Sequence, residues 1–198
     1  GSGALQSTGL IEIDSAITLN ANSRINANAG STLTISGSSG INGSSGNYDL
    51  TLGGAGNMSI SAPINLGTGA LTKSVGGTLS ITGAITVGSL VDESRASIAA
   101  NITTSGVQTY QGGADLTGDI TLAASTLTIG DGDSTDTIVG DGNDLTVTGI
   151  LDLNAAATTF DNISVSGASD LGANVTTTGN QTYSGAVTLS GGNRTLTG

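Results

Sequence analysis

The residues best suited to chemistry lie in one acidic, glycine-rich segment, Gly130 to Val147, which reads GDGDSTDTIVGDGNDLTV. Carboxylate oxygens on the tight turns that glycine permits suit Ca²⁺, because this hard cation binds oxygen ligands. The segment therefore predicts a calcium site, and calcium is the one cofactor that the sequence suggests. Its ligands would be the five aspartates Asp131, Asp133, Asp136, Asp141 and Asp144.

The segment matches known calcium-binding motifs only in part. Gly140 to Asp144, GDGND, resembles the calcium-binding nonapeptide repeat of RTX proteins. Leu145 follows Asp144 directly, however, where that repeat usually places one residue between, and no tandem copy adjoins it. An EF-hand loop is not matched either, because no Glu closes the segment. The alternative is an acidic turn that only water solvates.

Catalytic chemistry has little support in the composition. The chain has no His and no Cys, which excludes histidine-based triads, thiol nucleophiles and the common zinc sites. Both charge signs cluster only at Asp92, Glu93 and Arg95, within VDESRAS, and we interpret that segment as a surface loop that interrupts the regular structure. We therefore predict no catalytic residues and no enzyme. The alternative is a carbohydrate-active β-helix enzyme, a polysaccharide lyase or hydrolase with two placed carboxylates.

The charge balance excludes two classes of partner. The net charge is −11, and the only cations are Arg24, Lys73, Arg95 and Arg194. No basic surface can form to neutralise the phosphates of a nucleic acid or of an anionic membrane. No run approaches the ~20 apolar residues that span a bilayer, so we expect no membrane insertion.

The apolar residues are spaced for short β-strands. Nearly every apolar cluster alternates with polar residues, as in Leu33-Thr34-Ile35 and Ile85-Thr86-Val87, and Gly, Asn, Ser or Asp separates the clusters. A period of two places alternate side chains on one face of a strand. Aromatic residues make up only 2% of the chain, which favours a thin aliphatic core over a thick globular one. The pattern predicts an all-β protein.

Internal repeats narrow the architecture. NITTSGVQTYQG, from Asn101 to Gly112, returns as NVTTTGNQTYSG, from Asn174 to Gly185, with eight of twelve positions identical. Self-similarity of this kind is typical of solenoids. We predict a right-handed parallel β-helix (β-solenoid) with turns of about 20 residues, aliphatic columns inside, and Asn side chains stacked along the corners. Tyr110 and Tyr183 match within the repeat, so we assign them to packing.

Threonine pairs raise one further alternative. Several strands carry Thr-x-Thr, which would suit an ice-binding face if the pairs aligned on one flat side. We favour the simpler interpretation that they are the outward face of strands with high β-propensity. The pairs are Thr32/Thr34, Thr126/Thr128, Thr146/Thr148 and Thr195/Thr197.

The phrases TLTISGS, GALTKSVGGTLSITGAITVGS and NVTTTGNQTYSGAVTLSG resemble the strand repeats of filamentous-haemagglutinin-type adhesins, which use two-partner secretion, and of related autotransporter passengers. The resemblance covers most of the chain, although the amino-terminal secretion domain of that family is not evident. It implies a secreted or cell-surface bacterial rod that acts in adhesion, aggregation, biofilm or an extracellular fibre. Its partners would be host or bacterial surface glycans or proteins, or other copies joined end to end.

The organisation of the chain follows from the repeats. We expect residues 1–198 to form a single β-solenoid segment, a fragment of a longer repetitive chain. We interpret Gly1-Ser2-Gly3 as a remnant of cloning.

Overall fold

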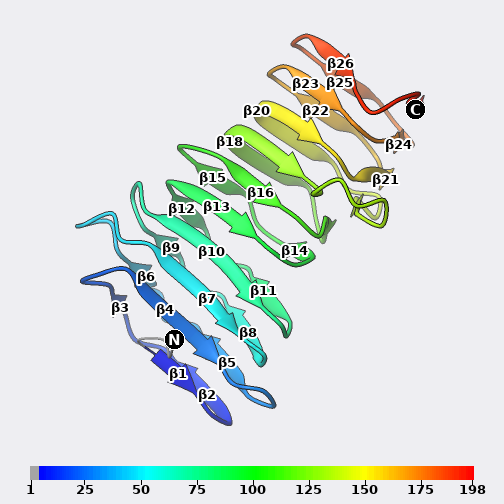
Figure 1. Ribbon diagram of the computed structural model, residues 1–198. Coiled ribbons are helices and arrows are strands. Elements are labelled where there is room, and N and C mark those ends of the chain that lie inside the picture. Colours follow the sequence, from blue (N-terminus) through cyan, green and yellow to red (C-terminus); the bar gives the residue numbers. More distant parts are fainter. Residues whose placement is uncertain (1–4) are drawn as a thin grey trace.

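The computed structural model describes residues 5–198, which form an all-β solenoid (Figure 1). The chain winds through about ten turns, and strands of successive turns pair in parallel. The predicted parallel β-solenoid is therefore confirmed. Among the described residues there is no helix that could cross a membrane. Gly1-Ser2-Gly3 lies outside these residues.

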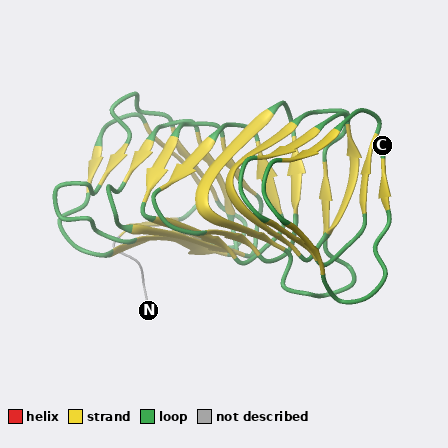
Figure 2. Ribbon diagram, turned by 90° about the horizontal axis from the view of Figure 1, so that it is seen from above, coloured by secondary structure: helices red, strands yellow, loops and turns green. Residues whose placement is uncertain are grey.

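Each turn contributes strands to three faces, which we call face 1, face 2 and face 3 (Figure 2). Face 1 contains β1 (Leu5–Ser7), β4 (Ser23–Ala27), β7 (Leu50–Gly54), β10 (Ala70–Val75), β13 (Ser89–Asp92), β16 (Gln108–Tyr110), the second halves of β18 (Ile120–Ile129) and β20 (Leu145–Leu153), β23 (Ser169–Leu171) and β26 (Val187–Leu189). Face 2 contains β2 (Leu10–Ile13), β5 (Thr32–Ile35), β8 (Asn57–Ile60), β11 (Leu79–Ile81), β14 (Ala96–Ile98), β17 (Ala114–Leu116), β19 (Thr137–Val139), β21 (Ala156–Phe160), β24 (Val175–Thr177) and β27 (Leu196–Thr197). Face 3 contains β3 (Ile17–Thr18), β6 (Ile41–Asn42), β9 (Ile64–Asn65), β12 (Ile85–Val87), β15 (Ile102–Thr104), the first halves of β18 and β20, β22 (Ile163–Val165) and β25 (Gln181–Tyr183).

The register gives the length of a turn. Leu90 pairs with Gln108 in one of the shortest turns, 18 residues on, and Ile25 pairs with Leu52 in the longest, 27 residues on. The predicted turn of about 20 residues lies within this range. The turn that carries the acidic segment is also long, because its extra residues form a loop between β18 and β19.

The core consists of the inward residues of all three faces. On face 2, Leu33 pairs with Met58 and Met58 with Leu79, and each of the three is at most 4% exposed. The polar residue between two such positions points outward, as the period of two predicts. Burying a large aliphatic side chain contributes about 1.5–3 kcal/mol, so a narrow column repeated in every turn stabilises the rod without a thick centre.

Asparagine and aspartate side chains connect the turns at the corners. At the corner before face 3, Asp119 Oδ1 accepts the backbone N–H of Asp144 at 3.0 Å. Asp144 Oδ1 in turn accepts the N–H of Asn162 at 3.0 Å, and Asn162 Oδ1 accepts that of Asn180 at 2.8 Å. Corner side chains thus bond from turn to turn as predicted, but here they accept backbone N–H groups, and two of the three acceptors are aspartates.

The two copies of the repeated phrase occupy different corners. The first supplies β15 and β16 and turns from face 3 into face 1, whereas the second supplies β24 and β25 and turns from face 2 into face 3. Their separation in the chain is therefore not a whole number of turns. The unit that repeats is a corner with its two strands, and it can be placed at more than one position of the turn.

Candidate functional site

The acidic segment flanks β19 of face 2, with a loop before this strand and a turn after it. Asp131, Asp133 and Asp136 lie in the loop between β18 and β19. Asp141 lies in the turn after β19 with a positive φ of 51°, and Asp144 immediately precedes β20. The structure thus separates the five predicted ligands into three local environments.

Within the loop, the carboxylates accept hydrogen bonds from the loop itself. Asp133 Oδ1 accepts the N–H and the hydroxyl of Thr135, at 2.9 and 3.0 Å, and these bonds hold the pKa of Asp133 below its usual value. Asp131 Oδ1 accepts the N–H of Asp133, and Asp136 Oδ2 accepts that of Asp131. These bonds stabilise the loop conformation and use carboxylate oxygens that a cation would otherwise take.

Residues 5–198 contain no group of three or more carboxylates that could hold a common metal ion. Asp144 Oδ1 accepts the backbone N–H and the side-chain amide of Asn162, one turn further along the rod. The carboxylates of the loop instead accept hydrogen bonds from within the loop. Calcium binding by Asp131, Asp133, Asp136, Asp141 and Asp144 therefore remains a prediction. Thermal melting with and without EDTA tests it, since a bound ion would raise the midpoint.

The VDESRAS segment does not form an interrupting loop, and that interpretation was wrong. Its first two residues end β13, its last two begin β14, and Glu93 to Arg95 form an ordinary corner. The alternation continues through it, so Asp92 points inward and is 4% exposed. Asp92 and Arg95 bind different partners and Glu93 is exposed, so the three charged side chains do not converge on one site.

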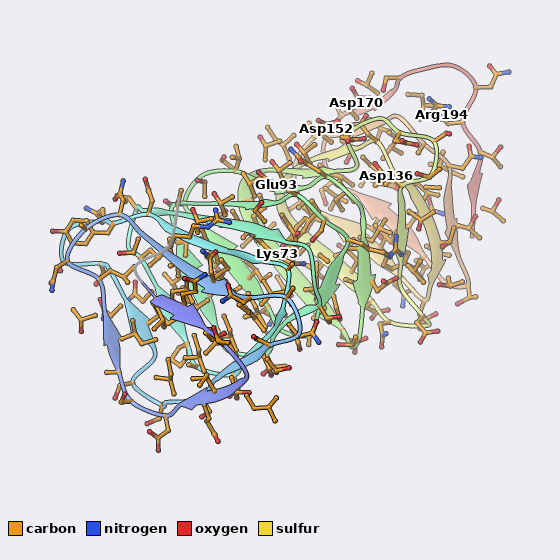
Figure 3. The ribbon with its side chains drawn as sticks, turned by 60° about the horizontal axis from the view of Figure 1, so that its bottom comes forward. Lys73, Glu93, Asp136, Asp152, Asp170 and Arg194 are labelled. Carbon is orange, nitrogen blue, oxygen red and sulfur yellow. The ribbon has the colours of Figure 1, made fainter. Side chains whose placement is uncertain are left out.

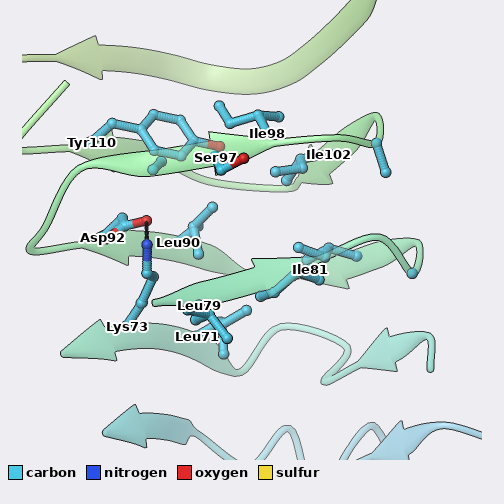
Figure 4. A pocket seen from close by; sticks show the side chains of 14 residues that line it. Leu71, Lys73, Leu79, Ile81, Leu90, Asp92, Ser97, Ile98, Ile102 and Tyr110 are labelled. Carbon is cyan, nitrogen blue, oxygen red and sulfur yellow. Dashed lines mark hydrogen bonds and ion pairs between the residues drawn. The ribbon is translucent and has the colours of Figure 1, made fainter. Parts of the chain in front are cut away.

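Asp92 forms a buried ion pair with Lys73 inside the rod (Figure 4). The two residues are register partners on face 1, Lys73 Nζ lies 2.8 Å from Asp92 Oδ2, and their side chains are 7% and 6% exposed. Burial raises the pKa of Asp92, against the opposing effect of the Lys73 ammonium. Sequence reasoning missed Lys73 as a core residue, although the alternation Leu71-Thr72-Lys73 points it inward.

Arg95 and Asp115 form the contrasting, exposed ion pair. Arg95 binds both carboxylate oxygens of Asp115, at 2.7 and 2.6 Å, and reaches Thr137 O one turn further along at 3.1 Å. The hydrogen bond from Arg95 lowers the pKa of Asp115. The pair fastens three successive turns at their surface and offers no free carboxylate for catalysis.

A small internal cavity of about 30 Å³ adjoins the buried pair. Leu90, Ile98 and Tyr110 line it together with Lys73 and Asp92. A water molecule occupies about this volume in the liquid, so the cavity suits ordered water rather than an organic ligand.

A larger, open groove of about 450 Å³ runs along the corner between face 1 and face 2 over the last turns. Asp136 and Arg194 contribute opposite charges to its lining (Figure 3). Asn154 and Asn174 contribute amides. Asp133 also lines it. We call this surface the corner groove. Its carboxylate, amide and guanidinium groups can bind a polar ligand through hydrogen bonds.

The signal that could have found the corner groove is positional. Asn154 and Asn174 come shortly after the face 1 strand of successive turns, so a solenoid stacks them at one corner. Without the turn boundaries, which vary in length, the sequence does not show that these residues lie together.

The Thr-x-Thr pairs do not share a side of the rod. Thr32/Thr34 and Thr195/Thr197 belong to face 2, whereas Thr126/Thr128 lies on face 1 and Thr146/Thr148 on face 3. Their hydroxyls are directed outward, as expected for the exposed side of strands. The one flat threonine array that ice binding needs is not formed by these pairs.

Comparisons of the chain with protein-family models, with curated proteins and with solved structures found no match.

Proposed function

We propose that the protein is a structural and adhesive segment of a secreted bacterial surface protein. The observation that supports this most is the unbroken parallel pairing of about ten turns, which makes a rod whose inner residues serve packing. A rod of stacked short strands separates two points in space and presents a regular surface along its length. The resemblance to filamentous-haemagglutinin-type repeats supports the same role.

The outward residues suit contact with glycans or proteins. On face 3, Thr121, Thr146, Ser164 and Thr182 are register partners in four successive turns. Each presents a hydroxyl that donates and accepts hydrogen bonds. The corner groove adds amides and both charge signs. Host or bacterial surface glycans or proteins are the partners that we propose for these surfaces.

The ends of the rod support a second kind of contact, with further copies. At the last turn, Val187, Leu189 and Leu196 are 44%, 52% and 42% exposed, and at the first turn Ile11 is 40% exposed. These residues occupy inward positions of their faces. Each terminal strand pairs on one side only among residues 5–198, and such edges bind another parallel strand. Head-to-tail contacts of this kind build filaments.

Adhesion of coated beads tests the proposed role. Beads carrying the purified chain are applied to epithelial cells and to bacterial lawns, beside albumin-coated beads. We expect retention above albumin, reduced by Asp136→Ala with Arg194→Ala in the corner groove. Arg24→Ala, a cation removed from face 1 near the other end, is the matched control and should retain wild-type adhesion.

Two results would contradict this role. One is retention no greater than that of albumin on every surface. The other is release of reducing or unsaturated sugar ends from a panel of polysaccharides, which would favour a carbohydrate-active enzyme.

A further inference from the structure

Seven asparagines stand in the tripeptide Asn-x-Ser/Thr, the acceptor sequence for N-linked glycosylation. They are Asn42, Asn57, Asn101, Asn162, Asn174, Asn180 and Asn193. All have exposed side chains except Asn162, which is partly buried. We propose that the folded rod is an acceptor for N-linked sugar at four of them: Asn42, Asn57, Asn101 and Asn174.

In these four residues the two ends of the side-chain amide have different roles. The carbonyl oxygen is held by the protein, and a backbone N–H can bond only to that oxygen, which fixes the orientation of the amide. The hydrogen bonds that these oxygens accept are Ser44 N–H to Asn42 Oδ1 at 3.1 Å, Thr78 N–H to Asn57 Oδ1 at 2.9 Å, Thr121 N–H to Asn101 Oδ1 at 2.8 Å, and Thr195 N–H to Asn174 Oδ1 at 2.9 Å. Their Nδ2 atoms donate no hydrogen bond to the described residues and are left for solvent.

This arrangement fits the chemistry of N-glycosylation. The amide nitrogen attacks the anomeric carbon of a sugar activated on a phosphate, an N–C bond forms, and the C–O bond to the phosphate breaks. The phosphate carrier leaves with the electron pair of that bond, and the amide nitrogen loses one proton. The product still has its carbonyl oxygen and one N–H. The corner hydrogen bonds made through Oδ1 are therefore kept when sugar is attached.

Asn162 is an internal control with the same tripeptide. Its Nδ2 donates to Asp144 Oδ1 at 2.9 Å, while its Oδ1 accepts the N–H of Asn180. Both ends of its amide are therefore used within the corner ladder. Asn47 is the converse control, with the geometry but without the acceptor sequence. Its Oδ1 accepts the N–H of Thr68 at 2.9 Å and its side chain is exposed. Asp49, however, stands where the acceptor sequence needs Ser or Thr.

The four sites are placed so that sugar would project from the rod. Asn101 and Asn174 directly precede strands, Asn57 begins one and Asn42 ends one, so all four lie at or beside corners. Attached sugars are bulky and solubilising, and at these positions they would leave the inward columns untouched. Asn174 also lines the corner groove, so sugar there would cover it, whereas the other three are not in its lining. This inference does not depend on the adhesive role.

Mapping of attached sugar tests the proposal. The purified folded chain is incubated with UDP-glucose and a soluble N-glycosyltransferase specific for Asn-x-Ser/Thr, and peptides are mapped by mass spectrometry. The denatured chain, incubated in parallel, shows which of the seven tripeptides the enzyme accepts without a fold. We expect hexose on Asn42, Asn57, Asn101 and Asn174 of the folded chain, and none on Asn162 or Asn47. Thr103→Ala, an exposed change that leaves Asn101 in place, should abolish hexose at that residue alone.

Incubation of the purified folded chain with an oligosaccharyltransferase and a lipid-pyrophosphate sugar distinguishes that donor from a nucleotide sugar. We expect the same four sites to carry sugar. The proposal is overturned if the folded chain takes no sugar at sites that the denatured chain accepts. Modification of Asn162 as fast as the four in the folded chain would overturn it equally.

Discussion

The two copies of the twelve-residue phrase are one sequence in two structural settings. In both, a threonine hydroxyl donates to the carbonyl two residues on, Thr104 to Gly106 O and Thr177 to Gly179 O, each at 2.9 Å. Both tyrosine hydroxyls donate to the glutamine two residues before, at 3.2 Å for Tyr110 and 3.3 Å for Tyr183. The local sequence therefore sets the same corner geometry on different faces of the rod.

The two copies differ in burial only where one of them has no neighbouring turn on one side among residues 5–198. The first strand of each copy has partners on both sides, and Thr104 and Thr177 are 6% and 4% exposed. The second strands differ, because β16 lies between β13 and β18 whereas β25 pairs only with β22 among the described residues. Tyr110 is accordingly 1% exposed, and Tyr183 is only partly buried. We therefore expect the neighbouring turn, rather than the repeated sequence itself, to decide how much each copy contributes to the free energy of unfolding.

Truncation of the tyrosines should give the largest difference in stability between the two copies. We expect Tyr110→Ala to lower the free energy of unfolding by about 3–5 kcal/mol, because it removes a fully buried ring and leaves a large cavity. Tyr183→Ala should cost less than about half of that, since water already reaches the ring. Urea unfolding followed by circular dichroism measures both. Equal losses would show that the neighbouring turn does not matter.

Truncation of the glutamines should give the next largest difference. The Gln108 amide donates to Ile102 O at 3.1 Å and to Ala123 O at 2.9 Å, and its side chain is fully buried. Gln108→Ala removes both bonds and the acceptor of the buried Tyr110 hydroxyl, and should cost about 1–3 kcal/mol. Gln181→Ala should cost less than about 1 kcal/mol, since water can replace the partly exposed amide. The same urea titrations measure both variants, and a larger loss for Gln181→Ala would contradict the comparison.

Alkaline titration should separate the two hydroxyls. Burial raises the pKa of Tyr110 and of Tyr183, and the Asp92 carboxylate raises the pKa of Tyr110 further. Because the folded state keeps protons that the unfolded chain releases near pH ~10, the free energy of unfolding should fall as pH rises past that value. In a Tyr48→Phe background, which leaves only these two tyrosines, tyrosinate absorbance should show Tyr183 ionising before Tyr110, with Tyr183→Phe removing the earlier step. Removal of that step by Tyr110→Phe instead would reverse the assignment.

Removal of the hydroxyls alone should have the smallest effect. Tyr110→Phe and Tyr183→Phe each delete one hydrogen bond to a glutamine oxygen and keep the ring. We expect a loss of about 0.5–1.5 kcal/mol for Tyr110→Phe, and a smaller one for Tyr183→Phe. Thermal melting in the same buffer measures both. A loss for Tyr110→Phe as large as that for Tyr110→Ala would assign the energy to the hydroxyl and not to packing.

The sequence predicts the strands well because a period of two is a local property. Leu33-Thr34-Ile35 and Ile85-Thr86-Val87 are strands with their apolar residues inward, as their patterns indicate. Turn length is predicted only as an average, because corners accept inserted residues such as the acidic loop without disturbing the ladders on either side.

The candidate sites are predicted less well because they depend on which residues meet across turns. Asp92 and Lys73 lie 19 residues apart and meet through register, so the charged segment around Asp92 looks like a surface loop when taken alone. The five aspartates are close in sequence, yet Asp144 joins a ladder that begins at Asp119. A shift of a few residues in turn length changes every such contact.

The in-register stacking of turns can be tested by disulfide formation, since the chain has no cysteine of its own. Thr86 is the register partner of Thr103, and Thr103 is the partner of Ala123 one turn further. Adjacent strands lie about 4.8 Å apart, within reach of a disulfide, and alternate strands at about twice that distance are beyond it. Under mild oxidation we expect Thr86→Cys with Thr103→Cys to form the bond nearly completely, and Thr86→Cys with Ala123→Cys to remain reduced. A bond in the second variant and none in the first would contradict the parallel solenoid.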